Sequence, residues 1–102
     1  MGLAMLAEPV TAEQALAWGM IWQVVDDVAL MDEARTLAKR LAAGPTLALG
    51  RIKQALNASA GNSLATQLDL ERDLQRELGR SSDFAEGVAA FLQKRPAQFK
   101  GN

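Results

Sequence analysis

The sequence lacks two of the side chains that most often carry out chemistry in proteins. It has no cysteine, which excludes disulfide bonds and thiolate metal sites, and no histidine, which removes the commonest general base and metal ligand. Aromatic residues are few, with two tryptophans and three phenylalanines among 102 residues. We therefore predict no catalytic residue and no metal site in this chain, and we expect it to be inactive on its own.

Long apolar runs are also missing. No run approaches the roughly 18 apolar residues that suggest a membrane-spanning helix, and residues 1–7 lack the basic start and the length of a secretory signal. We predict a cytoplasmic protein with no membrane partner. Apolar residues still make up 49% of the chain, and alanine and leucine dominate them, which predicts one domain of helices packed closely on one another.

Positive charge is absent from the first third of the chain. Residues 1–34 carry six acids and no lysine or arginine, whereas the remainder carries eleven bases and six acids. An acidic first third argues against a nucleic-acid surface, and most of the later bases are interleaved with acids. We predict no nucleic-acid partner. Only the bases near the C-terminus lack a neighbouring acid: Lys94, Arg95 and Lys100.

The most informative stretch is SSDFAEGVAAFLQKRPAQF, residues 81–99. Ser81 or Ser82 is suited to cap a helix, acids follow in its first turns, and Pro96 prevents its continuation. Gly87 within this helix predicts the close approach of another backbone. Four apolar residues fall on one stripe, which we expect to be buried: Phe84, Val88, Phe91 and Leu92.

The segment before residue 30 has a different pattern. Thr11 and Gln14 predict a capping box for a short helix that ends at Gly19. Residues 21–25 are rich in β-branched and aromatic side chains and predict a strand, which needs a partner edge that this sequence does not supply. The pair Asp26 and Asp27 is suited to cap the next helix. The fold class predicted is therefore mainly α, with one short β-strand.

Three helices are predicted between this segment and Ser81. They run from residue 27 to Gly44, from Pro45 to 57 and from Ser63 to 78, with a turn at 59–62. The expected buried face of the first of these helices is Leu30, Met31, Ala34, Leu37, Ala38 and Leu41. In the second helix the expected buried residues are Ala48, Ile52, Ala55 and Leu56, and the residues expected to face outward are Arg51, Lys53 and Gln54. In the third helix the expected buried face is Leu64, Leu68, Leu70, Leu74 and Leu78. The last helix carries three potential i,i+3 ion pairs: Asp69–Arg72, Asp73–Arg76 and Glu77–Arg80.

Several polar and aromatic residues allow more than one interpretation. Asp69 and Asp73 lie among arginines, which favours a solvated, paired face over an acid/base pair. Asp26 and Asp27 have no third carboxylate nearby and are interpreted as caps rather than metal ligands. The tryptophans, Trp18 and Trp22, are expected to be packing residues, with the border of an acyl pocket as the alternative.

The order S-x-D-x-x-E-G-x-x-A-F-x-x-K-R-P-x-x-F resembles the C-terminus of the crotonase (enoyl-CoA hydratase/isomerase) superfamily. The stretches QLDLERDLQRELGRS, PTLALGRIKQALNAS and TAEQALAWGMIWQVVDD extend the resemblance over the whole chain. Within the superfamily they are most similar to an acyl-CoA isomerase of phenylacetate catabolism, with an ordinary enoyl-CoA hydratase as the alternative.

The resemblance implies a role as the C-terminal part of a longer crotonase subunit. Residues 1–25 would end the crotonase core and residues 26–102 would form the C-terminal helical assembly domain. The family's oxyanion-hole amides and catalytic carboxylate would lie upstream of Met1. The family further implies an acyl-CoA substrate, no cofactor other than the coenzyme A of that substrate, and homotrimers that pair into hexamers.

Phe91 and Lys94 are the two site residues that the resemblance suggests. In crotonases the phenylalanine and lysine of the A-F-x-x-K pattern reach a neighbouring subunit's coenzyme A. An aromatic ring can stack on adenine and an ammonium can pair with a phosphate. From the residues alone, a core phenylalanine and a lysine that interacts with the helix dipole remain the alternatives.

A different class of function is also compatible with the composition. The chain could be a free-standing helical oligomerisation module without a ligand. The unpartnered strand argues against this, as does the uncapped apolar stretch 1–6, which is typical of a helix cut through its middle and predicts that the true N-terminus is missing.

Overall fold

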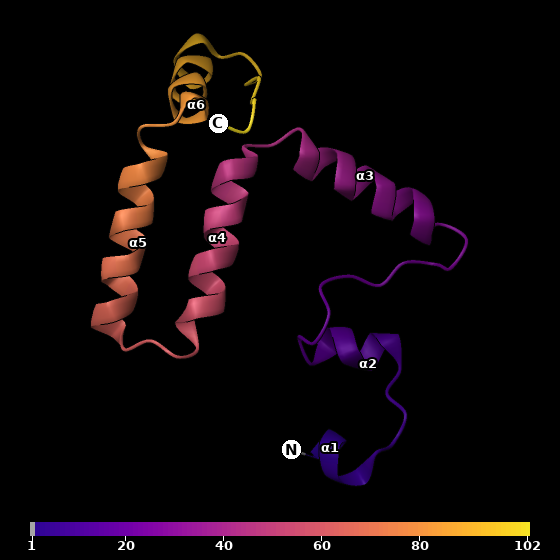
Figure 1. Ribbon diagram of the computed structural model, residues 1–102. Coiled ribbons are helices and arrows are strands. Elements are labelled where there is room, and N and C mark those ends of the chain that lie inside the picture. Colours follow the sequence, from indigo (N-terminus) through magenta and orange to yellow (C-terminus); the bar gives the residue numbers. More distant parts are fainter. Residues whose placement is uncertain (1) are drawn as a thin grey trace. The chain divides into compact units, whose positions relative to one another are not determined.

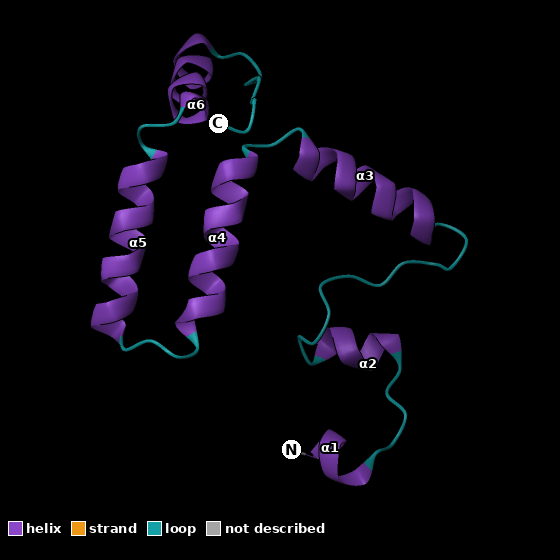
Figure 2. Ribbon diagram, in the orientation of Figure 1, coloured by secondary structure: helices purple, strands orange, loops and turns teal. Residues whose placement is uncertain are grey.

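The computed structural model describes residues 2–102, and within this range it has six helices and no strand (Figures 1 and 2). This confirms the prediction of a mainly α fold. The helices are α1 (Gly2–Leu6), α2 (Ala12–Ala17), α3 (Leu30–Ala42), α4 (Thr46–Ser59), α5 (Leu64–Leu78) and α6 (Ser82–Gln93).

The chain divides into two compact units, Met1–Arg35 and Thr36–Asn102. The boundary between these units falls inside α3. The division after residue 25 that the family resemblance implies concerns a longer fold, and it stays a prediction.

In the first unit, the predicted capping box is present at the start of α2. The Thr11 hydroxyl accepts a hydrogen bond from the Gln14 N–H at 3.2 Å, and the Thr11 N–H donates to the Gln14 side chain at 3.0 Å. The helix ends at Trp18, and Gly19 follows with a φ of 71°, a conformation that suits glycine. Both predicted ends of this helix are confirmed.

The strand predicted at residues 21–25 is absent from the structure. The segment forms a bend followed by irregular backbone, and no strand elsewhere in residues 2–102 offers it a partner edge. An isolated segment cannot form the hydrogen bonds of a sheet, so its β-branched residues alone do not make it a strand.

The start of α3 differs from the prediction as well. The helix begins at Leu30, after a turn in which the main-chain carbonyls of Asp26 and Asp27 accept hydrogen bonds from the N–H groups of Ala29 and Leu30. These aspartates therefore act through their backbone in a turn and not as side-chain caps. Asp26 lies four positions and Asp27 three positions before Leu30, whereas an N-cap residue lies directly before the first residue of the helix.

In the second unit, α4 and α5 form an antiparallel hairpin, seen side by side in Figure 1. Pro45 precedes α4, and the Ser63 hydroxyl caps α5 by accepting from the Thr66 N–H at 3.2 Å. The predicted helix over residues 63–78 is confirmed. Across the hairpin, both Arg51 Nε and Nη2 donate to Glu77 Oε1, at 3.1 and 2.5 Å.

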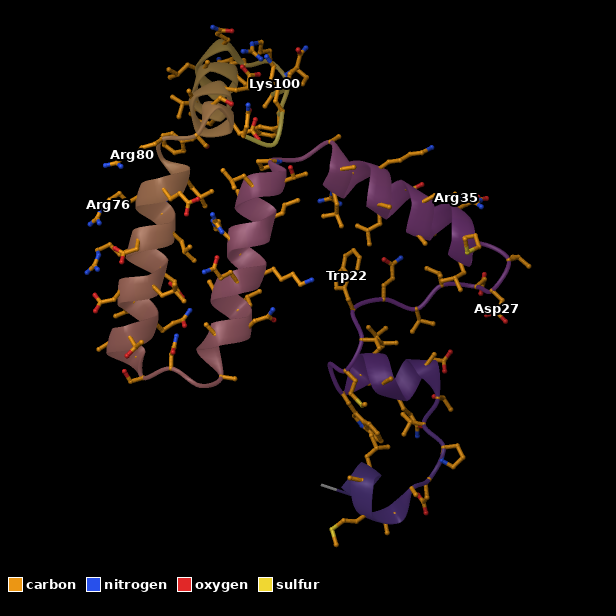
Figure 3. All side chains as sticks on the ribbon, in the orientation of Figure 1. Trp22, Asp27, Arg35, Arg76, Arg80 and Lys100 are labelled. Atoms are coloured by element: carbon orange, nitrogen blue, oxygen red, sulfur yellow. The ribbon has the colours of Figure 1, made fainter. Side chains whose placement is uncertain are left out.

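This cross-hairpin bond replaces one predicted ion pair. Asp69–Arg72 and Asp73–Arg76 are formed, with N–O distances of 2.6 and 3.3 Å. The predicted Glu77–Arg80 pair is not, because α5 ends at Leu78 and Arg80 lies in the turn beyond the helical register. In Figure 3, Arg76 and Arg80 lie on the side of α5 that points away from α4. The prediction that Arg51 faces outward was wrong, because its guanidinium binds Glu77 of α5.

The apolar faces of the helices are only partly covered. On α5, Leu70, Leu74 and Leu78 are half-buried, as predicted, but the first two leucines of that face, Leu64 and Leu68, are exposed. Ile52 and Leu56 of α4 are exposed, and on the predicted face of α3 only Leu37 is half-buried. The two helices of the hairpin cover only part of each other's apolar surface. Among residues 2–102 only Ala90 and Asp83 are buried.

Candidate functional site

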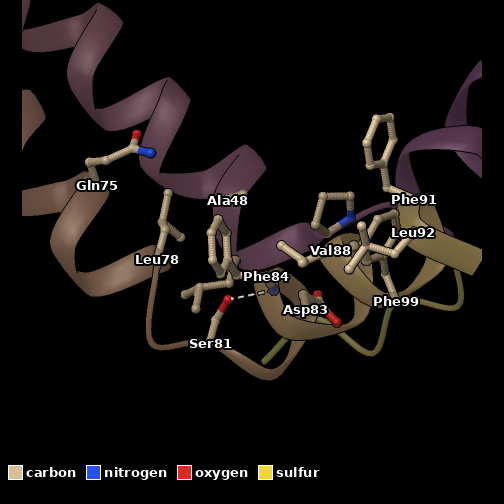
Figure 4. Close-up of a pocket in the computed structure, with 13 residues that line it drawn as sticks. Ala48, Gln75, Leu78, Ser81, Asp83, Phe84, Val88, Phe91, Leu92 and Phe99 are labelled. Carbon is tan, nitrogen blue, oxygen red and sulfur yellow. Dashed lines mark hydrogen bonds between the residues drawn. The ribbon is translucent and has the colours of Figure 1, made fainter.

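The candidate site is the C-terminal half of the second unit, where α6 and the tail after it lie together (Figure 1). Ser81 is the N-cap of α6, and its hydroxyl accepts from the Phe84 N–H at 3.0 Å, the bond dashed in Figure 4. This confirms the predicted cap. The serine fixes the start of the helix from which the other site residues project.

Asp83 has a role that the sequence did not suggest. Its side chain is only 5% exposed, and its two oxygens accept hydrogen bonds from the main-chain N–H groups of Lys100, at 2.7 Å, and Gly101, at 2.8 Å. We expected an exposed acid that favours the positive end of the helix dipole. The structure shows instead a buried carboxylate that binds the returning tail.

The end of the tail is held by several further contacts. The Asp83 N–H and the Ser82 hydroxyl both donate to the main-chain carbonyl of Asn102, at 3.0 and 2.8 Å. Gly101 has a φ of 82°, and a Cβ at this position would overlap the Thr46 hydroxyl at the start of α4. Only glycine meets both conditions, so this residue allows the tail to reach the starts of α4 and α6.

Glu86 forms the second attachment of the tail. It accepts hydrogen bonds from Arg95 Nη1 and Nη2, at 2.6 and 2.9 Å, and from the Gln98 N–H at 2.8 Å. The bonds from Arg95 and then that from Gln98 lower the pKa of Glu86 from 4.5 to about 2, although partial burial opposes this. The same carboxylate raises the pKa of Arg95. We call Asp83, Glu86, Arg95 and the main chain of residues 98–102 the tail clasp.

The C-terminus of α6 turns sharply at Lys94. This residue has φ 53° and ψ 41°, in the left-handed region, and its N–H donates to the last turn of the helix. The Arg95 N–H donates to the Ala90 carbonyl at 3.1 Å. Glycine is the usual residue at such a helix end, and here a lysine adopts the conformation with its side chain exposed.

Phe99 anchors the middle of the tail. A Cβ added at Gly87 would lie 3.7 Å from the Phe99 ring, an ordinary contact distance, so the ring lies close to Gly87 without requiring a glycine there. We predicted the close approach of another backbone, and this part of the prediction was wrong. The Phe99 ring is half-buried and lies beside α6, so it gives the tail an apolar contact with this helix.

An apolar groove of about 440 Å³ runs beside α6. Figure 4 shows its lining, which comes from the start of α4, the end of α5, the apolar stripe of α6 and the tail, and includes Ala48, Leu78, Phe84, Val88, Phe91 and Phe99. The stripe that we expected to be buried is largely exposed, because within the second unit the end of the α4–α5 hairpin and the tail cover only part of it.

Phe91 stands at the rim of this groove. It is 83% exposed, and in Figure 4 its ring points away from Ser81 and Asp83. Within residues 2–102 it is therefore not a core residue. Lys94, one turn further along, is exposed too. The structure brings the two predicted site residues to the same end of one helix, while their role in ligand binding stays a prediction.

The remaining candidates show no second site. Asp69 and Asp73 form the paired, exposed face that we predicted. Trp18 and Trp22 are more than half exposed, and Trp18 borders a small hollow of the first unit with Leu3 and Leu6. No group of three or more acidic, histidine or cysteine side chains in this range is placed to hold a metal ion. None of the helices described is long and apolar enough to cross a membrane.

Known proteins resemble this chain in both sequence and structure. The enoyl-CoA hydratase/isomerase family model matches residues 1–102. The chain is 61% identical over 101 residues to the 1,2-epoxyphenylacetyl-CoA isomerase of Escherichia coli strain K12, covering 99% of this chain and 38% of that protein. It is 37% identical to the 2,3-dehydroadipyl-CoA hydratase of the same organism, covering 97% of this chain and 39% of that protein.

Among solved structures, an enoyl-CoA hydratase from Mycobacterium marinum matches with a TM-score of 0.89 at 32% identity, covering all of this chain and 40% of that one. An enoyl-CoA hydratase from Polaromonas sp. JS666 matches with a TM-score of 0.88 at 33% identity, covering 94% of this chain and 37% of that one. The chain thus spans about two fifths of the length of the relatives it matches. These matches confirm the resemblance seen in the sequence: the chain belongs to the enoyl-CoA hydratase/isomerase family of the crotonase superfamily.

Proposed function

We propose that the full-length subunit containing this chain is an acyl-CoA isomerase that converts ring-1,2-epoxyphenylacetyl-CoA to an oxepin in cytoplasmic phenylacetate catabolism. The support is the 61% identity to the Escherichia coli isomerase, against 48% to a probable enoyl-CoA hydratase and 37% to a further hydratase of the family. An enoyl-CoA hydratase is the second candidate, because two solved relatives with this arrangement of helices bear that name.

Within that enzyme, we assign to this chain one edge of the coenzyme A site. The single observation that carries the assignment is the exposed Phe91 ring at the rim of the groove, with Lys94 at the end of the same helix. The ring is free to stack on adenine, and the ammonium is free to pair with the 3′-phosphate. Neither side chain has a packing role among residues 2–102 that would explain its position.

The reaction itself would depend on groups outside this chain. In the family, an oxyanion hole stabilises the thioester carbonyl and a carboxylate moves a proton, and we propose that both belong to parts of the subunit upstream of residue 1. We therefore expect no turnover from this chain alone. The second role that we propose for it is assembly into homotrimers and hexamers, supported by the uncovered apolar stripe of α6.

The test of the coenzyme A assignment is a change of ligand preference in the full-length enzyme. Lys94→Ala should raise KM for the acyl-CoA thioester and leave KM for the 3′-dephospho-CoA thioester unchanged, because only the first carries the 3′-phosphate. Lys53→Ala, which removes an exposed lysine of α4, is the matched control and should change neither value. An equal rise for both thioesters, or no rise for either, would place Lys94 outside the phosphate site.

A further inference from the structure

The conformation of Lys94 requires an explanation. Its φ of 53° places a long side chain in the left-handed region, which glycine adopts far more readily. A residue persists in such a conformation when its surroundings hold it there, and such residues are concentrated at functional sites. The groups that hold this turn are therefore candidates for a functional role of their own.

Main-chain bonds from Lys94 and Arg95 to the last turn of α6 close the turn, and Glu86 is the side chain that ties down the residues after it. It lies one turn after the start of α6, and it binds the guanidinium of Arg95, the residue directly after Lys94, through both carboxylate oxygens. The same carboxylate accepts the Gln98 N–H, so residues on both sides of Pro96 are tied to one point on the helix. The Glu86 side chain is 23% exposed, and it points to the tail rather than into the groove.

Asp83 holds a different part of the tail. Its partners are the N–H groups of Lys100 and Gly101, which lie six and seven residues after Lys94. Loss of this carboxylate would release the end of the tail and leave the pair between Glu86 and Arg95 in place. The two carboxylates of the tail clasp can therefore be separated by experiment.

We propose that Glu86 is a positioning residue for coenzyme A recognition: through Arg95 and Gln98 it fixes the turn at Lys94, and so presents Lys94 and Phe91 together to the nucleotide end of the ligand. This inference rests on the proposed function of those two residues. Glu86 itself does not touch the ligand. A fixed turn lowers the conformational entropy that Lys94 loses when it binds a phosphate.

The test compares two thioesters in the full-length enzyme. Glu86→Gln keeps the size of the side chain but loses the charge and one of the two acceptor oxygens. We expect KM for the acyl-CoA thioester to rise roughly 3- to 10-fold, as for other residues that act through a partner, with kcat unchanged. KM for the corresponding acyl-pantetheine thioester should stay the same, because that ligand lacks the adenine and the 3′-phosphate.

Two further variants show whether the effect is specific. Glu77→Gln also separates a glutamate from an arginine, Arg51, but on the α4–α5 hairpin, and it should leave both KM values unchanged. Arg95→Lys retains the positive charge at the helix end and loses the fork that binds both oxygens of Glu86. It should reproduce the preference change, and it provides the same test if Glu86→Gln fails to fold.

A double-variant cycle shows whether Glu86 acts through the two site residues. In an enzyme that already carries Phe91→Ala and Lys94→Ala, Glu86→Gln should raise KM for the acyl-CoA thioester by less than 2-fold, because the groups that it positions are gone. An undiminished effect in that background would overturn the proposal. So would equal rises in KM for the CoA and pantetheine thioesters, or no rise for either.

The outcome separates this inference from the proposed function. If Phe91→Ala and Lys94→Ala leave KM for the acyl-CoA thioester unchanged, the assignment of the coenzyme A site fails, and the positioning role fails with it. If those variants raise KM while Glu86→Gln and Arg95→Lys do not, the coenzyme A site stands and only the positioning role is lost.

Discussion

Two sets of carboxylates in the second unit differ both in their partners and in their surroundings. Asp69 and Asp73 on α5 pair with arginines three residues further along, and more than half of each of these side chains is exposed. Asp83 and Glu86 on α6 bind groups that lie nine to eighteen residues away in sequence, and Asp83 is buried. The first set lies on the surface of a helix whose position other contacts determine. The second set determines where the tail lies.

The comparison shows why residue type alone does not indicate the importance of an acid. An exposed pair within one helix contributes little, because water and salt screen it and two long side chains lose conformational freedom. A buried carboxylate that accepts two main-chain N–H groups leaves unsatisfied donors when it is removed. The predictions below test this contrast, beginning with the largest expected effect.

Asp83→Asn should release the end of the tail. An amide has one acceptor oxygen where the carboxylate has two, so either the Lys100 or the Gly101 N–H loses its partner. The loss of a hydrogen bond to a charged, buried group predicts about 10- to 100-fold faster amide hydrogen exchange at these two residues in the full-length protein. Asp69→Asn on α5 is the control. Unchanged exchange in Asp83→Asn would mean that the tail is held without this carboxylate.

Glu86 should make the stability of the protein depend on pH in a defined window. Its pKa is about 2 in the folded chain, lowered by Arg95, by the Gln98 N–H and, to a smaller extent, by the charge of Lys100. A lowered pKa favours folding above the ordinary value near 4.5, and the contribution is lost as pH falls from there toward 2. The difference in unfolding free energy between wild type and Glu86→Gln should therefore be constant above about pH 5.5 and shrink below it.

Subtracting the unfolding free energy of Glu86→Gln from that of the wild type removes the effect of the other acids, because both proteins contain them. Urea unfolding at a series of pH values provides the measurement. A difference that stays constant down to pH 3, or that grows as pH falls, would show that Glu86 is not held ionised by the tail clasp.

Much of the fold was predictable from local sequence. The caps predicted at Thr11 and Ser81 follow from side chains that bind an N–H group three residues away, and the structure has both. The predicted start of a helix at Ser63 is also found, and there the serine hydroxyl is the cap. Helix ends at Gly44 and Pro96 were predicted on similarly local grounds, and they agree with the structure. Short-range hydrogen bonding and backbone restriction need no knowledge of the rest of the fold.

The caps expected at Asp26 and Asp27 failed for a local reason, because α3 begins only at Leu30, but most of the other errors concern contacts that are distant in sequence. The strand at residues 21–25 needed a partner edge, and its composition could not supply one. Glu77 pairs with Arg51 of the neighbouring helix, and Asp83 binds the main chain of a tail seventeen residues away. The glycine at Gly101 was the one available sign of the returning tail, because a glycine near a chain end can mark a tight contact. The candidate site residues came from family resemblance, since the local pattern placed Phe91 on an apolar stripe and so predicted a buried residue.

The smallest effect is expected from Asp73→Asn on the exposed face of α5. Asp73 contacts both Arg72, at 3.1 Å, and Arg76, at 3.3 Å, yet all three side chains are more than half exposed. Exposed pairs of this kind rarely stabilise a protein measurably, so we expect the melting temperature of the full-length protein to fall by no more than about 2 °C. The shift should decrease further in 1 M salt, because screening weakens the attraction between the charges that the variant separates. Amide exchange at residues 98–102 should not change at all. A fall in melting temperature well above 2 °C that persists in high salt would mean that the charged face of α5 is covered in the full-length protein. The contrast between the two sets of carboxylates would then no longer hold.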